Sequence, residues 1–138
     1  MWTKLFPKHP TLKTAMKEYK RIVFVDDDLN HLLIGKLVLE RRGYEVLTLN
    51  NCEDLIARVL DFNADLIFMD HNMPEISGLD ATQLLKGDSR TCDIHVIYFS
   101  GEKNIESLAT QAGADGWLSK PFQIEEMVKT VKRYSELR

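Results

Sequence analysis

Acidic side chains follow two apolar segments of the chain, and their positions suggest a site for a divalent cation. Asp26, Asp27 and Asp28 come directly after the apolar residues 22–25, and Asp70 ends a second apolar run. Two carboxylates about 4 Å apart repel each other by roughly 4 kcal/mol at an effective dielectric constant near 20. A cleft that holds several carboxylates therefore needs a cation, and a set of oxygen ligands suits Mg²⁺ better than zinc or copper.

A hydroxyl and an ammonium group follow two further apolar runs. Ser100 comes after residues 94–99, and Lys120 follows the short run 116–118 with one residue between them. A carboxylate can attack phosphorus to give an acyl phosphate, and Mg²⁺, an ammonium and a hydroxyl could each contact one of the three phosphoryl oxygens. The backbone carbonyl of Asn72 could add one more oxygen ligand for the metal. This complete set of partners favours a phosphoryl site over a plain metal site.

The apolar runs are nearly continuous, which is typical of parallel strands that are covered on both faces. Segments with helical periodicity separate the runs, so the sequence predicts an α/β fold with a doubly wound, five-stranded parallel sheet. In the flavodoxin-like strand order 2-1-3-4-5, the first and third strands are neighbours, and their acidic ends face each other at the carboxyl edge of the sheet. The predicted strands are 22–25, 46–49, 66–69, 94–99 and 116–118.

Five apolar stripes predict the helices between these strands. In the first helix we expect Leu32, Leu33 and Leu37 to form the stripe. The other stripes are Leu55/Ile56/Val59/Leu60, Leu84/Leu85, Ile105/Leu108/Ala109/Ala112 and Ile124/Met127/Val128/Val131.

The first 20 residues form a basic extension that precedes a single domain at 21–138. Residues 1–21 carry six basic groups and one acid, and the rest of the chain carries 12 basic and 20 acidic groups, a net charge of −8. The acidic body is therefore a poor candidate for nucleic-acid binding. Leu12, Ala15, Met16 and Tyr19 have helical spacing, so the extension is either a disordered arm or a short helix that docks on the body, on a partner or on a membrane surface.

Composition limits the remaining classes. The longest apolar stretch falls well short of the roughly 20 residues that span a membrane, and the N-terminus lacks the apolar core of a secretory signal. Cys52 and Cys92 are isolated, which fits reduced thiols in a cytoplasmic protein. Among the histidines, we expect His31 to lie on the surface, His95 to be hydrogen-bonded in the core, and the side chain of His71 to point away from Asp70.

From about residue 21 onward, the chain resembles a response-regulator receiver domain of two-component systems, the CheY-like family. The resemblance rests on four motifs in order, at residues 25–28, 69–78, 99–101 and 119–122. It implies that Asp70 is the phosphoacceptor and that Ser100 and Lys120 bind the phosphoryl group. It also implies that Asp26, Asp27, Asp70 and the carbonyl of Asn72 hold Mg²⁺.

The resemblance implies further features of the switch. Trp117 would swing inward as Ser100 moves toward the phosphate, and the peptide bond between Lys120 and Pro121 would be cis. The signal would pass through the face made by the helix near 105–112, the strand at 116–118 and the last helix. The phosphodonor would be a histidine kinase or a histidine phosphotransfer protein, and the chain would catalyse only its own phosphorylation and dephosphorylation rather than act as an enzyme.

Two alternatives stay open at this level. A receiver-like scaffold could bind a partner without being phosphorylated, although such scaffolds usually lack one of the key residues, and none is missing here. A phosphatase of the haloacid-dehalogenase type would use a similar set, but it needs a second acid two residues after the nucleophile, where this chain has Asn72. These residues identify no downstream target or output domain, and the chain is either a stand-alone receiver or the receiver part of a longer protein.

Overall fold

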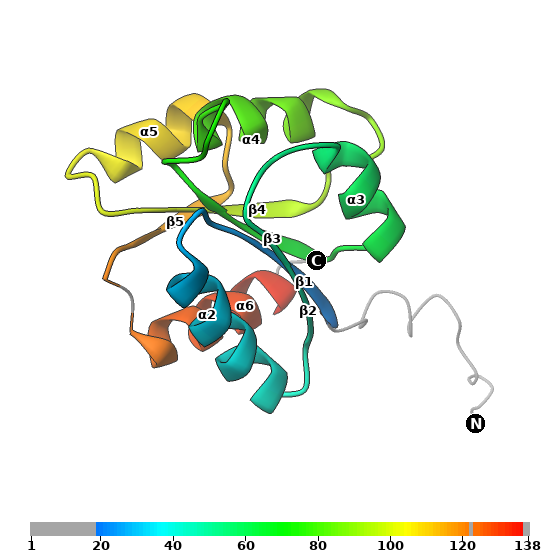
Figure 1. Ribbon diagram of the computed structural model, residues 1–138, viewed down its shortest axis with the longest axis vertical. Helices are drawn as coiled ribbons and strands as arrows, with labels where there is room; N and C mark the ends of the chain where they lie inside the picture. The colour runs from blue at the N-terminus through cyan, green and yellow to red at the C-terminus, as the bar shows by residue number, and fades with distance from the viewer. Residues whose placement is uncertain (1–18, 122, 137–138) are drawn as a thin grey trace.

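The computed structural model describes residues 19–121 and 123–136, and in this part strands and helices alternate regularly (Figure 1). The predicted extension at 1–20 lies outside the described residues except for Tyr19 and Lys20. The elements are β1 (Arg21–Val25), α2 (Leu29–Arg41), β2 (Glu45–Leu49), α3 (Leu55–Phe62), β3 (Leu66–Asp70), α4 (Gly78–Gly87), β4 (His95–Ser100), α5 (Ile105–Ala112), β5 (Gly116–Ser119) and α6 (Ile124–Glu136).

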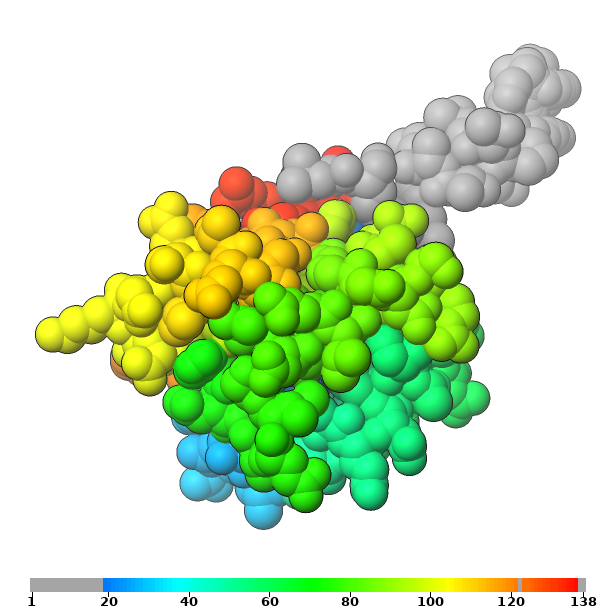
Figure 2. Space-filling model, turned by 90° about the horizontal axis from the view of Figure 1, so that it is seen from above, coloured from blue at the N-terminus to red at the C-terminus, as the bar shows by residue number. Residues whose placement is uncertain are grey.

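The strands form one parallel sheet in the order β2-β1-β3-β4-β5, which confirms the predicted flavodoxin-like topology. Helices cover both faces of the sheet, with α3, α4 and α5 on one face and α2 and α6 on the other (Figure 1). Figure 2 shows the molecule from the side of α3, α4 and α5. Every residue of β3 is buried, as expected for a central strand between two helical layers. Among the described residues, every helix is too short or too polar to span a membrane.

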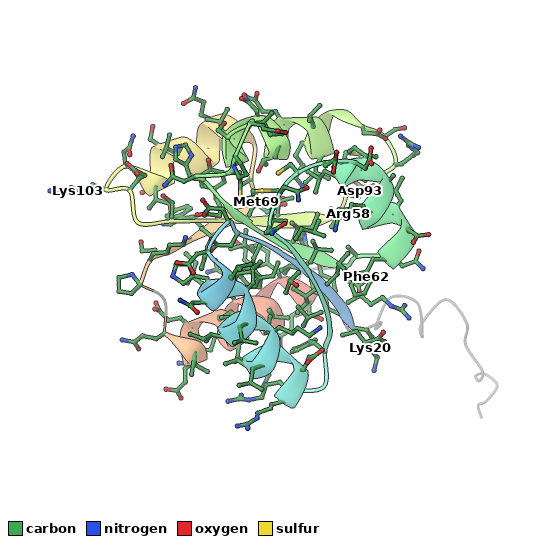
Figure 3. The ribbon with its side chains drawn as sticks, in the orientation of Figure 1. Lys20, Arg58, Phe62, Met69, Asp93 and Lys103 are labelled. Atoms are coloured by element: carbon green, nitrogen blue, oxygen red, sulfur yellow. The ribbon has the colours of Figure 1, made fainter. Side chains whose placement is uncertain are left out.

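Two apolar cores lie on opposite faces of the sheet. One core packs the sheet against α3, α4 and α5, and it includes Met69, which Figure 3 shows between the sheet and these helices. The other packs the sheet against α2 and α6 around three contacting phenylalanine rings, Phe24, Phe68 and Phe99. Tyr19 also belongs to this second core, because its side chain is buried although it precedes β1.

The prediction of which residues of the first helix pack against the sheet is partly wrong. In α2 the buried positions are Leu32, Gly35 and Leu39, whereas Leu33 and Leu37 are 66% and 51% exposed. Leucines occur on more than one side of this helix, so residue type alone did not identify the side that packs against the sheet. The last helix follows its predicted stripe at Met127, Val128 and Val131, with Ile124 exposed at its start.

The strand register places the polar residues side by side at the carboxyl edge of the sheet. Val25 pairs with Met69, so the residues that follow them, Asp26 and Asp70, are neighbours across β1 and β3. Ser100 lies one residue beyond the Phe99 that pairs with Asp70, and it pairs with Ser119, directly before Lys120. Parallel strands end at a common edge, so these groups converge there without long loops.

The loop after β3 returns so closely to the strand that only glycine fits at its end. The amide of Gly78 donates to the carbonyl of His71 at 2.8 Å, and Ser77 caps the following helix by accepting from the amide of Asp80. A Cβ at Gly78 would lie 1.9 Å from the backbone carbonyl oxygen of Asp70. An atom cannot be accommodated at that distance, and the obstacle is backbone that cannot rotate away.

We therefore expect Gly78→Ala to lower the free energy of unfolding by about 1–3 kcal/mol, because the loop or the end of β3 must shift. Gly87→Ala is the matched control in the same helix, since a Cβ there would meet no neighbouring heavy atom within 4 Å. Urea titration of the three proteins measures the difference. Equal stability of Gly78→Ala and Gly87→Ala would contradict the close approach.

Candidate functional site

Three carboxylates meet at the carboxyl edge of the sheet. Asp26, Asp27 and Asp70 each place an oxygen within 4.8 Å of the others. The side chains of Asp26 and Asp70 are almost fully buried, and Asp27 is exposed at the mouth of the cleft. Asp28, the third acid of the run, instead caps α2 by accepting from the amides of Asn30 and His31.

Lys120 joins the two buried carboxylates. Its Nζ lies 2.9 Å from Asp70 Oδ1 and 3.1 Å from Asp26 Oδ2, and it sits 4.7 Å from the centre of the Phe99 ring. The peptide bond between Lys120 and Pro121 is cis. Burial alone would lower the pKa of Lys120, but the hydrogen bond to Asp70 and the charge of Asp26 raise it overall, so the ammonium stays charged.

The two oxygens of Asp70 differ in their hydrogen bonding. Oδ1 accepts from Lys120, whereas Oδ2 is buried and has no hydrogen-bond partner within the described part of the chain. Burial raises the pKa of Asp70 to about 6, the hydrogen bond from Lys120 opposes this shift, and the charge of Asp26 adds to it. A buried carboxylate oxygen without a partner is costly, which indicates that this position is built to receive a ligand.

Ser100 lies at the end of β4 with its side chain buried. Its Oγ accepts from the amide of Glu102 at 3.0 Å, and its carbonyl accepts from the amide of Lys120 at 2.9 Å. The backbone thus ties the ends of β4 and β5 together beside Asp70. The hydroxyl acts as an acceptor in the bond from Glu102, so its own O–H can donate to a ligand.

The other predicted residues lie around this centre. Asn72 is exposed in the loop between β3 and α4, two residues beyond Asp70. Trp117 lies on β5, outside the cleft, with 45% of its surface exposed. The side chain of His71 contacts the buried hydroxyl of Tyr98 rather than a carboxylate of the cleft, as expected. His95 makes its predicted hydrogen bond, with Tyr19 as partner, but it is half-buried at the start of β4 and not in the core.

His31 also reaches the acidic cleft, which its position in the sequence did not predict. We expected it on the surface, but its Nδ1 lies 3.0 Å from Asp26 Oδ2 and only about a third of its side chain is exposed. Helical side chains lean toward the N-terminus of their helix, so a residue in the first turn after an acidic cap can reach back to the preceding strand end. The spacing of three residues from the Asp28 cap was the signal available in the sequence.

The donor set fits Mg²⁺. The three carboxylates supply oxygen ligands only, and Asp70 Oδ2 has the free coordination that a metal or a phosphoryl group requires. Asp27 and Asp70 would hold the ion most directly, because both oxygens of Asp26 already accept hydrogen bonds. The carbonyl of Asn72 would complete the set proposed from the sequence.

Comparisons with known proteins agree with this arrangement. The family model for the response regulator receiver domain matches residues 22–132. The phosphate regulon transcriptional regulatory protein PhoB of Pseudomonas aeruginosa is 34% identical over 115 residues, which cover 82% of this chain and 50% of PhoB, so the chain spans about half of that relative. The polar-differentiation response regulator DivK of Brucella anthropi is 30% identical over 117 residues, covering 83% of this chain and 95% of DivK.

A solved structure shares the fold. The receiver domain of the sensor histidine kinase PA1611 from Pseudomonas aeruginosa superposes with a TM-score of 0.77 at 21% identity, covering 84% of this chain and 97% of that domain. That structure is described as holding a magnesium ion in its active-site cleft.

The raised pKa of Asp70 predicts how stability depends on pH. The pKa of Asp70 is about 6 in the folded protein against an ordinary value of 3.8, so folding takes up a proton between these values. The contribution of Asp70 to stability therefore falls as pH rises from about 4 to about 6, and it stays low above that range. In the absence of Mg²⁺, we expect Asp70→Asn to raise the free energy of unfolding at pH 7.5 by on the order of 1–3 kcal/mol, and by much less at pH 4.5.

Urea titrations at these two pH values test this expectation. Asp88→Asn is the matched control, and we expect it to lower the free energy of unfolding at pH 7.5 rather than raise it. The hydrogen bonds from Arg90 lower the pKa of Asp88 to about 2, so the charged form of this carboxylate stabilises the folded protein. A gain from Asp70→Asn that is equal at both pH values would show that the charge of Asp70 is not its cause.

Proposed function

Because the chain belongs to the response-regulator receiver family, we propose that it is a phosphorylation switch in which Asp70 accepts a phosphoryl group from a histidine kinase or a histidine phosphotransfer protein. The observation that carries this proposal is the buried Oδ2 of Asp70, which has no hydrogen-bond partner among the described residues and lies beside a pair of acids and a lysine. Buried carboxylate oxygens in structural ion pairs normally have a hydrogen-bond partner, so this exception supports a ligand-binding role for Oδ2.

The transfer step follows from this arrangement. Asp70 Oδ2 attacks the phosphorus atom of a phosphohistidine and forms a P–O bond, while the P–N bond breaks and its electron pair returns to the donor imidazole. Lys120 moves its hydrogen bonds from the carboxylates to a phosphoryl oxygen, and the Ser100 hydroxyl donates to another. Mg²⁺, when bound by the carboxylates, supplies the positive charge that offsets their repulsion of the incoming phosphoryl group.

The residue two positions after Asp70 argues against a phosphatase of the haloacid-dehalogenase type. Such an enzyme requires a general acid or base two residues after the nucleophile. That residue is Asn72, whose amide does not transfer protons, so hydrolysis here would rely on water that reaches the acyl phosphate unaided. Release of the phosphoryl group is then a reset of the switch and not turnover of an external substrate.

The output surface that we propose is the face made by α5, β5 and α6. Trp117 on β5 is 45% exposed, and Ile124 at the start of α6 is 47% exposed. Because neither side chain is fixed in the core, both can shift between solvent and the protein surface when Ser100 moves. Ser100 pairs with Ser119, two residues beyond Trp117 on the same strand. A displacement of Ser100 toward a phosphoryl group would therefore reach this face through a short segment of β5.

The phosphodonor would dock on the exposed apolar side of α2. Leu29, Leu33 and Leu37 follow each other at intervals of four residues, and Ile34 lies beside them, with exposed fractions of 66%, 66%, 51% and 47%. Leu29 directly follows the Asp28 cap, so this apolar surface begins at the mouth of the cleft. A phosphohistidine must reach Asp70, and the adjoining surface suits an apolar helical face of a kinase or phosphotransfer domain.

Intact mass measured after incubation with acetyl phosphate tests the central step. We expect a gain of one phosphoryl group in the presence of Mg²⁺, little gain with EDTA, and none in Asp70→Asn. Asp93→Asn is the control, since this aspartate lies before β4 and outside the acidic cluster. An adduct that persists in Asp70→Asn would show that another residue is the phosphoacceptor. The absence of an adduct on the wild-type chain would refute the proposed switch.

Leu33→Glu tests the docking surface. We expect phosphotransfer from a purified phosphohistidine protein that labels the wild-type chain to slow by at least about tenfold, because a charge replaces apolar contact area. Labelling by acetyl phosphate should stay unchanged, since this small donor needs no docking surface. Leu84→Glu is the matched control, because Leu84 is 55% exposed on α4. Equal slowing by both variants would rule out a specific role for α2.

A further inference from the structure

His31 makes a contact inside the acidic cleft that the proposed chemistry has not yet used. Its Nδ1 lies 3.0 Å from Asp26 Oδ2, and its Nε2 lies 3.7 Å from an oxygen of the Asp28 cap. The ring also packs edge-on against Phe99, with 6.4 Å between the ring centres. The backbone of the first turn of α2, the Asp28 cap and the Phe99 ring therefore fix the position of the imidazole.

Asp26 is fully buried, and its carboxylate shares the contact with His31 among three partners. Oδ1 accepts from the amide of Asp28 at 2.9 Å, and Oδ2 is shared between His31 and Lys120 at 3.0 and 3.1 Å. The amide of Asp28 and the ring of His31 are therefore partners with fixed positions, whereas the third partner, Lys120, is at the end of a flexible side chain. Lys120 is also the hydrogen-bond partner of Asp70.

The proposed phosphoryl transfer requires Lys120 to move. To reach a phosphoryl oxygen on Asp70, its ammonium must weaken or give up its contact with Asp26. A buried carboxylate that loses a charged partner is strongly destabilised unless other donors remain. Among the side chains described here, His31 is the one that still donates to Asp26 Oδ2 after such a movement.

We propose that His31 is a positioning residue that holds the Asp26 carboxylate in the cleft while Lys120 engages the phosphoryl group. This inference rests on the proposed function of Asp70. The imidazole touches neither the phosphoryl group nor the acceptor and acts through Asp26. It lowers the cost of the phosphorylated state and changes the resting state little, because in the resting state Lys120 also binds Asp26.

The test compares His31→Leu, which removes the donor, with His31→Gln, which keeps an N–H on a side chain of similar reach. Asn30→Leu is the matched control, one residue earlier in the same exposed helical turn. Two quantities are measured at saturating Mg²⁺: the maximal rate of phosphorylation by acetyl phosphate, and the affinity for beryllofluoride by ¹⁹F NMR. Beryllofluoride mimics the bound phosphoryl group without turnover.

For His31→Leu we expect both the maximal rate and the beryllofluoride affinity to fall on the order of tenfold, the effect of one charge-assisted hydrogen bond. The half-saturating concentration of acetyl phosphate and the urea midpoint of the unphosphorylated protein should change little. His31→Gln should recover most of the loss, and Asn30→Leu should behave as the wild type.

Wild-type rate and affinity in His31→Leu would overturn the inference while leaving phosphorylation of Asp70 intact. Equal losses in the leucine and glutamine variants would also overturn it, because the shape of the ring and not its hydrogen bond would then matter. Failure of the wild-type chain to gain a phosphoryl group would instead refute the function on which the inference rests, so the two failures are distinguishable.

Discussion

One ammonium group holds two buried carboxylates together in the cleft. Lys120 lies within 3.1 Å of both Asp26 and Asp70, which would otherwise repel each other in a region sheltered from water. The compensation is incomplete, since the pKa of Asp70 remains raised and one of its oxygens has no partner in the described structure. The resting site is therefore ready to bind positive charge or a group that brings hydrogen-bond acceptors for Lys120.

This balance depends on the register of the sheet. The central strands β1 and β3 place Asp26 and Asp70 side by side, and the backbone bond from Lys120 to Ser100 fixes the end of β5 against β4. A slip of one residue between β1 and β3 would turn a carboxylate into one of the apolar cores, and a slip between β4 and β5 would displace Lys120 from the cleft. The buried strands exclude such a slip, because their side chains fill the space on both faces of the sheet.

The sequence predicted the parts of this structure that depend on residue type along strands. Nearly continuous apolar runs identified every strand, and the polar residues that follow them identified the candidate site. It did not predict the rotation of α2, in which Leu33 faces out and Leu32 faces in. It also missed the contact between His31 and Asp26, because this contact depends on that rotation. Both features arise from tertiary packing, which a pattern of leucines on several sides of a helix leaves undetermined.

Two local constraints explain that rotation. Asp28 caps α2 at its first turn and so fixes where the helix begins, and Gly35 lets it approach the sheet closely, since a Cβ there would lie 2.7 Å from the Phe24 ring. At about 100° per residue, Leu32, Gly35 and Leu39 then share the inner side of the helix. The same rotation directs His31 toward Asp26 and leaves Leu33 on the opposite flank, facing solvent. One helix thus contacts a buried carboxylate through His31 and presents an apolar surface beside it, so a partner bound to that surface would lie next to the cleft that holds Asp26 and Asp70.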